Sequence, residues 1–222
     1  FTGVVKKAVS LRVIKDADDI WYCQRLLNEA FISLKQHQSG PVHINIPLVG
    51  DTNALWNESV KKLRNGQARK INYVSVDDTE MWQQMAKILS SKKRVIIVMG
   101  QDCSGDENLH QALMQYCSYT QVPILLDNLS NFRCSQMVWA EPVIKALNAN
   151  SIEGMLPEVV ITFGNNFQER IKDLLKAHQG KFEHWSIDQE GVVRDVFKSQ
   201  TALFECKPAY FFNYFTKNVI PT

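Results

Sequence analysis

The sequence lacks several features that would point directly to a function. Its longest purely apolar run covers residues 95–99, which is far too short to span a bilayer. Lysine and arginine number 25, and aspartate and glutamate number 23, so the formal charge of +2 gives no reason to expect nucleic acid as a partner. The five cysteines are widely spaced and form no C-x-x-C pair, which argues against a disulfide framework and fits a reducing cytoplasm.

Motifs of nucleotide binding and hydrolysis are also missing. No G-x-G-x-x-G follows a strand pattern and no G-x-x-x-x-G-K-[ST] occurs, which disfavours classical NAD binding and P-loop hydrolysis. The absence of G-x-S-x-G argues against an α/β-hydrolase. Cys103, His110 and Cys117 suggest a metal site, but on a helix successive members would lie about 10 Å apart, too far for one zinc ion. We expect them to be small buried residues.

The chain of 222 residues has room for one large domain or two small ones. It begins Phe1-Thr2-Gly3, without an initiator Met or a signal-peptide core, so we expect it to start inside a longer protein. Residues 1–49 predict one helix, with Asp16 as its N-cap, and one strand near 42–48. Residues 50–76 are polar and irregular and are interpreted as a linker.

From Asp77 onward, helix and strand patterns alternate. The strand patterns are continuous apolar runs, which are typical of a parallel sheet buried on both faces. Strands are predicted at residues 95–99, 122–126, 159–163, 182–187 and 201–205. Helices are predicted from 77, from 106, over 138–148, over 167–178 and from 208. The fold class predicted for residues 77–222 is therefore α/β, a doubly wound parallel sheet with helices on both faces.

The carboxyl ends of the predicted strands carry small polar residues. These segments are residues 100–102, 127–130, 164–166 and 188–190. Ligands bind beyond the carboxyl ends of strands in open α/β sheets, so the segments could line a crevice. They could equally be simple turns and helix caps, and their sequence does not decide between the two.

Three phrases carry a family resemblance. They are G-P-V-H-I-N-I-P-L at residues 40–48, V-P-I-L-L-D-N-L-S at 122–130 and P-E-V-V-I-T-F-G at 157–164. Their order resembles that of thiamine-diphosphate-dependent enzymes, and most of all the synthases of menaquinone biosynthesis. The resemblance implies that residues 1–49 are the C-terminal end of the pyrimidine-binding domain. Residues 77–222 would then be the Rossmann-like middle domain, joined by a linker over 50–76.

The resemblance also implies an activity for the whole enzyme. Such a synthase uses thiamine diphosphate with Mg²⁺ (or Mn²⁺), decarboxylates 2-oxoglutarate and adds the succinyl-semialdehyde carbanion to isochorismate. It would be a cytoplasmic homodimer or homotetramer with small-molecule substrates and no nucleic acid or membrane partner. The family's activating Glu and its G-D-G motif have no counterpart in this sequence. We therefore expect no catalytic, cofactor-binding or metal-binding residue in the chain, and no activity from the chain alone.

The family's middle domain supplies a basic residue to the substrate pocket, just after the F-G strand. Counted without a gap, Arg170 falls at that position, and with one deletion Glu169 does. A cation is reasonable there because both implied substrates are carboxylates. Arg133 is a second basic candidate. The other expected substrate-binding residues are the polar ones at the carboxyl ends of strands: Asn128, Ser130 and Asn165.

Two alternatives remain open. The chain could be the middle domain of another 2-oxoacid enzyme of this superfamily, of the acetolactate-synthase or oxidase type, with FAD or ADP bound. It could instead be a non-catalytic oligomerisation or regulatory module, an idea suggested by five aromatic residues between 210 and 215. We expect those aromatics to close the core, because only one stripe of such a helix needs to be hidden.

Overall fold

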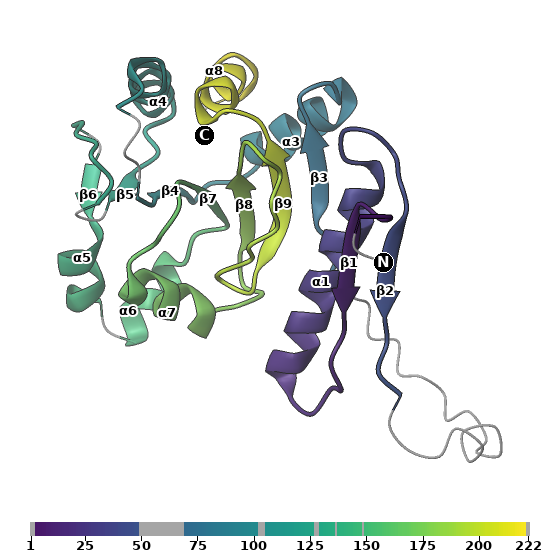
Figure 1. Cartoon of the computed structure of the whole chain (residues 1–222). Coiled ribbons are helices and arrows are strands. Elements are labelled where there is room, and N and C mark those ends of the chain that lie inside the picture. The colour runs from purple at the N-terminus through teal and green to yellow at the C-terminus, as the bar shows by residue number, and fades with distance from the viewer. Residues whose placement is uncertain are drawn as a thin grey trace. The chain divides into compact units, whose positions relative to one another are not determined.

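A computed structural model of the chain describes residues 3–48, 69–101, 105–126, 129–135, 137–147 and 149–220 (Figure 1). The chain divides into two compact units, Phe1–Ile71 and Asn72–Thr222. In the described part, none of the helices combines the length and the apolar character that a membrane span requires.

The first unit is a β-α-β arrangement. Strand β1 (Lys7–Ser10) and strand β2 (Val42–Asn45) pair in parallel, and helix α1 (Ala17–Lys35) connects them. The predicted N-cap is confirmed, since the Asp16 side chain accepts the Asp19 N–H at 2.9 Å. The sequence pattern predicted only one strand here. It did not reveal β1, because four residues are too few for an alternation to be recognised.

The second unit contains a sheet of seven parallel strands. Their order is β3-β9-β8-β7-β4-β5-β6. The bounds are β3 Asn72–Ser75, β4 Val95–Met99, β5 Ile124–Leu126, β6 Met137–Trp139, β7 Val159–Phe163, β8 Glu183–Ile187 and β9 Gln200–Glu205. Every pairing in the sheet is parallel, which confirms the predicted α/β class.

Helices cover both faces of this sheet. Helices α3 (Thr79–Ser90), α4 (Glu107–Thr120) and α8 (Pro208–Asn218) pack on one face, and α5 (Ala140–Ala146) and α7 (Glu169–Ala177) pack on the other. Figure 1 shows α4 beside α8 and, across the sheet, α5 near α7. Helix α6 (Ala149–Met155) precedes β7. The strand residues alternate between the two layers, so that Ile97 and Met99 face the first while Val98 faces the second.

Three boundaries differ from the predicted ones. Residues 72–75, which the sequence pattern placed in the linker, form β3 and pair with β9. Residues 138–139, which were expected in a helix, belong to β6, and α5 begins only at Ala140. The helix predicted from 77 begins at Thr79, and Asp78 caps it by accepting the Met81 N–H at 3.0 Å. Edge strands of three or four residues carry little pattern of their own.

The aromatic residues of α8 close the core, as expected. Phe211, Phe212 and Phe215 have no exposed surface. Phe211 and Phe215 pack against Trp82 of α3, whose indole N–H donates to Ser75 O at 2.8 Å, and Phe212 packs against Tyr116 of α4. The aromatic stripe therefore stabilises the second unit and leaves little of itself for a partner.

Candidate functional site

The strand order creates a topological switch point between β4 and β7. From β4 the chain runs outward through β5 and β6, then returns on the other side of β4 through β7, β8 and β9. Ligands in open parallel sheets bind at the carboxyl ends of the strands near such a point. The loops after β4 and β7 are therefore the first place to look for a site.

These two loops are hydrogen-bonded to each other through their backbones. The Gly100 N–H donates to Phe163 O at 2.9 Å. The Gln101 N–H donates to Asn166 O at 2.8 Å, and the Asn165 N–H donates back to Gln101 O at 3.0 Å. A Cβ on Gly100 would stand 2.7 Å from Asn166 O, so the approach requires glycine. Backbone atoms thus fill the switch point, where a nucleotide-binding fold would leave space.

A crevice of about 360 Å³ opens beside this closed point, at the carboxyl ends of β7 and β8 and the first turns of α4 and α8. Its volume is in the range of small-molecule sites. The charged residues that line it are Asp106, Asp188, Glu190, Arg194 and Lys207. With three carboxylates against two cations, this crevice does not favour a phosphate or a dicarboxylate.

Two of these carboxylates have structural roles. Asp188 lies 3.1 Å from the Arg194 guanidinium and also accepts the Glu190 N–H at 2.9 Å. Asp106 is the N-cap of α4 and accepts the Asn108 N–H at 2.9 Å. Carboxylates that hold turns and helix starts contribute local stability, typically about 1 kcal/mol for a cap. Their positions are explained without a ligand.

The residues described do not fit a metal ion with a diphosphate. Across the ranges that the structure covers, no group of three or more His, Cys, Asp or Glu could hold a metal. The whole sequence contains no G-D-G. Cys103 of the suspected cluster lies outside the described residues. Burial raises the pKa of the Cys117 thiol to about 12, so Cys117 stays protonated and is unsuited to a metal.

Of the predicted substrate residues, Asn165 lines the crevice and Arg170 does not. Arg170 lies in the first turn of α7 with its side chain about half exposed, and its Nε is 3.9 Å from Glu141. Glu141 interacts more closely with Lys145, at 2.8 Å. Lys145 foremost, and Arg170 to a lesser degree, hold the pKa of the Glu141 carboxyl below its usual range. The guanidinium is therefore only loosely held.

Ser130 and Arg133, the other two candidates that the structure describes, do not line this crevice. Ser130 is fully buried, and its hydroxyl donates to Met99 O at 2.9 Å, which ties the loop after β5 to β4. Arg133 is exposed and lies 4.7 Å from the ring centroid of Trp139. Asn128 lies outside the described residues.

Two basic residues of the crevice, Arg194 and Lys207, were not anticipated from the sequence. Lys207 follows β9 by two positions, so the rule that carboxyl ends meet at one edge could have indicated it. Arg194 stands seven residues after β8, in a segment without helix or strand. Nothing in its local sequence signals that it turns back toward the sheet.

Comparisons with known proteins give a consistent result, although no family model matches the chain. Three curated relatives are each named 2-succinyl-5-enolpyruvyl-6-hydroxy-3-cyclohexene-1-carboxylate synthase. The Bacteroides fragilis protein is 32% identical in an alignment of 222 positions that covers 95% of this chain and 38% of the relative. The Bacteroides thetaiotaomicron protein is 31% identical, again over 95% and 38%. The Porphyromonas gingivalis protein is 30% identical over 90% and 34%.

The chain thus spans less than two fifths of the length of these relatives. An X-ray structure from Mycobacterium smegmatis, assigned as a thiamin diphosphate-dependent enzyme, covers 99% of this chain and 40% of its own, with 14% identity. Its TM-score of 0.38 is too low to carry weight, so the assignment rests on the sequence relatives. Through them, the chain belongs to the thiamine-diphosphate-dependent enzymes, in the family that includes these synthases.

Proposed function

We propose that this chain is part of a synthase that decarboxylates 2-oxoglutarate and joins the remaining four-carbon unit to isochorismate in menaquinone biosynthesis. The observation that supports this is the 30–32% identity to synthases of that name over 90–95% of the chain. In this proposal, residues 1–49 end the pyrimidine-binding domain, a linker begins near residue 50, and the unit from Asn72 is the middle domain.

In this proposal, the chain shapes the active centre of the whole enzyme and does not carry its reactive groups. Its described residues offer no metal cluster, and the sequence has no G-D-G. Thiamine diphosphate, with Mg²⁺ or Mn²⁺, would supply the decarboxylation chemistry from elsewhere in the whole enzyme. The 222-residue chain alone is therefore proposed to be inactive. Isothermal titration with thiamine diphosphate and Mg²⁺ should show no saturable binding to it.

The activity itself is tested on the full-length protein. With thiamine diphosphate, Mg²⁺ and 2-oxoglutarate, carbon dioxide release should require isochorismate for sustained turnover, and mass spectrometry should identify the joined product. Pyruvate in place of 2-oxoglutarate should be a poor substrate. Rapid turnover of pyruvate, or a yellow flavin that copurifies, would move the protein to the acetolactate-synthase or oxidase type.

Arg170 is proposed to contact a substrate carboxylate. It is half exposed, and the ion pair with Glu141 that the described residues give it is long, at 3.9 Å, so its guanidinium can turn toward a ligand. A hydrogen-bonded charge pair of this kind is worth about 1.5–3 kcal/mol. Arg170→Ala in the full-length protein should therefore raise KM for a carboxylate substrate roughly 10- to 100-fold. Lys87→Ala, at an exposed lysine of α3 that pairs with neither candidate, is the control and should leave KM unchanged.

Glu169 remains the alternative occupant of the family's basic position. It is ion-paired with Lys172 at 2.5 Å, and Lys172 holds its pKa below the usual range. If Arg170→Ala leaves KM unchanged while Glu169→Gln changes it, Glu169 holds that position. Asn165 and Arg133 are proposed as weaker contributors to the substrate wall. Ser130 is proposed to act by fixing the loop after β5.

We also propose that the whole enzyme is a cytoplasmic homodimer or homotetramer. Light scattering coupled to gel filtration of the full-length protein distinguishes the two. A monomer that turns over both substrates would contradict this part of the proposal.

A further inference from the structure

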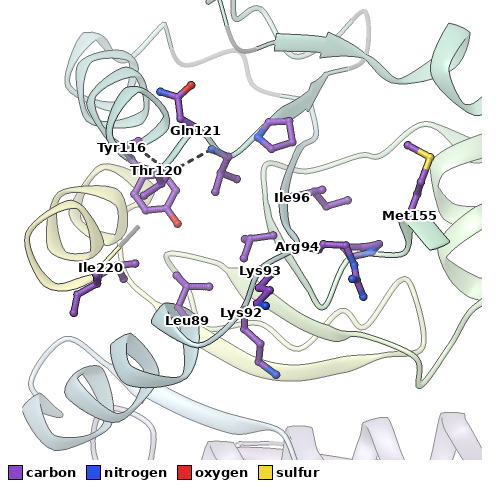
Figure 2. Close-up of a pocket in the computed structure, with 15 residues that line it drawn as sticks. Leu89, Lys92, Lys93, Arg94, Ile96, Tyr116, Thr120, Gln121, Met155 and Ile220 are labelled. Carbon is purple, nitrogen blue, oxygen red and sulfur yellow. Dashed lines mark hydrogen bonds between the residues drawn. The ribbon is translucent and has the colours of Figure 1, made fainter. Parts of the chain in front are cut away.

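A second pocket lies at the opposite, amino-terminal edge of the seven-stranded sheet. Its volume is about 430 Å³, in the range of small-molecule sites. Three helices of one layer end around it, with Leu89 from α3, Tyr116 from α4 and Val219 just after α8. Figure 2 shows Leu89, Ile96 and Tyr116 around the space, with Ile220 at one side.

The lining of this pocket divides into an apolar floor and a basic rim. The floor consists mainly of aliphatic and proline side chains: Leu89, Val95, Ile96, Val122, Pro123, Met155, Pro157, Val219 and Ile220. The rim carries three consecutive cations, Lys92, Lys93 and Arg94, and no carboxylate belongs to the lining residues. The carboxyl-edge crevice has the opposite balance, with more carboxylates than cations.

The three cations are not equally engaged. The Lys92 ammonium is 2.7 Å from Glu183, and the Arg94 Nε–H donates to Leu156 O at 2.8 Å. The remaining carboxylate nearby, Glu158, accepts the backbone N–H groups of Lys93 and Arg94. The Glu158 carboxylate is thus hydrogen-bonded to backbone N–H groups and is not paired with the Lys93 ammonium. No ion pair of the Lys93 side chain occurs among the described residues, so Lys93 is the cation best able to accept a ligand.

The one phenol in the pocket does not oppose an anion. Figure 2 shows the oxygen end of Tyr116 pointing into the pocket, whereas Gln121 points away from it. Tyr116 is 1% exposed, and its burial raises the pKa of the phenol above its ordinary value. The phenol therefore stays neutral at physiological pH.

We propose that this pocket binds a small amphipathic carboxylate, whose apolar body lies on the aliphatic floor and whose charged group meets Lys93 at the rim. Burial of the apolar body supplies the affinity, since each methylene removed from water favours binding. The excess of cations at the rim selects the anion over a neutral compound of the same shape. The site is independent of the proposed reaction, because it lies at the opposite edge of the sheet from Asn165.

Titration calorimetry with decanoate and 1-decanol tests this site on the 222-residue chain, and no enzymatic activity is needed. Decanoate should bind at one site, at least fivefold more tightly than decanol. Raising the salt from 50 to 500 mM should weaken the binding of decanoate and leave that of decanol unchanged, since salt screens the charge at the rim. Binding that does not saturate, or equal binding of the two compounds, would overturn the proposal.

Variants locate the site. Lys93 is exposed, so Lys93→Gln should leave the fold intact and weaken decanoate about fivefold, and Lys93→Glu should weaken it more than tenfold. Lys87 is an exposed lysine of α3 outside the pocket, so Lys87→Gln is the matched control, and its affinity for decanoate should stay within twofold of wild type. Val122→Trp should block binding of both compounds by filling the floor. Wild-type affinity in Lys93→Glu would show that the carboxylate binds elsewhere.

Discussion

Phe211 at the centre of the aromatic core provides the sharpest test of how the second unit is held together. Its ring is fully buried, with its centroid 4.3 Å from that of Phe215, 4.8 Å from Phe204 and 6.1 Å from Trp82. Phe211→Ala removes a ring on which α8, α3 and β9 all pack. Tyr210, the preceding residue, is 42% exposed and serves as the control.

The expected cost follows from burial. Truncation of a fully buried Phe to Ala typically costs about 3–5 kcal/mol, because transfer energy is lost and a cavity remains. A central value of about 4 kcal/mol corresponds to a fall in Tm of roughly 8–16 °C for a unit of this size. Tyr210→Ala should cost only about 1 kcal/mol, since much of that ring already contacts water. Phe211→Leu keeps most of the volume and should fall between the two.

Urea unfolding followed by tryptophan emission measures these differences. Trp82 and Trp185 are buried in the same core and report on the second unit directly. If Phe211→Ala and Tyr210→Ala cost the same to within about 0.5 kcal/mol, α8 is not packed as described. The aromatic residues of α8 would then be candidates for the oligomerisation or regulatory surface that the sequence alone leaves open.

Three further predictions concern local structure. Asp16→Ala removes the N-cap of α1 and should cost the first unit about 1 kcal/mol, seen as earlier loss of helical circular dichroism in urea. Gly100→Ala brings a Cβ within 2.7 Å of Asn166 O and should cost about 1–3 kcal/mol in the same assay, whereas Gly154→Ala, with open space around it, should be neutral or stabilising. Two backbone N–H groups hold the pKa of the Glu158 carboxyl below its ordinary value, so its contribution to stability is present above that ordinary value and is lost as the pH falls through the lowered, folded-state pKa. In acid titrations of Tm, wild type should therefore lose more stability than Glu158→Gln as the pH falls below the ordinary pKa of a glutamate, and parallel losses would contradict this.

The central strands could be predicted from the sequence and the edge strands could not. Residues 95–99 and 159–163 are continuous apolar runs because β4 and β7 are buried on both faces, and their predicted bounds are the observed ones. Strand β3 exists because β9 pairs with it from about 130 residues away. No local pattern encodes such a pairing, so the sequence N-Y-V-S by itself predicts linker.

The candidate site depended on strand order, which the sequence pattern does not contain. The sequence places four loops at the carboxyl edge of the sheet, but it does not predict which of these loops contact one another. The backbone hydrogen bonds that join Gln101 to Asn165 and Asn166 form because β4 lies beside β7. The link between Arg170 and Glu141 likewise arises from the packing of α5 on α7. Side-chain partners of this kind follow from tertiary structure and not from spacing.

The opposite charges of the two pockets have a common physical origin. In a sheet whose strands are all parallel, the connecting helices start near the carboxyl edge and end near the amino edge. Helix starts favour carboxylates and helix ends favour cations. Asp106 at the start of α4, and Lys92 and Lys93 just after α3, follow that rule. The pocket at the amino edge therefore combines cations with an apolar lining, whereas the crevice beside Asn165 has more carboxylates than cations. An amphipathic anion should bind the first of these two sites more tightly.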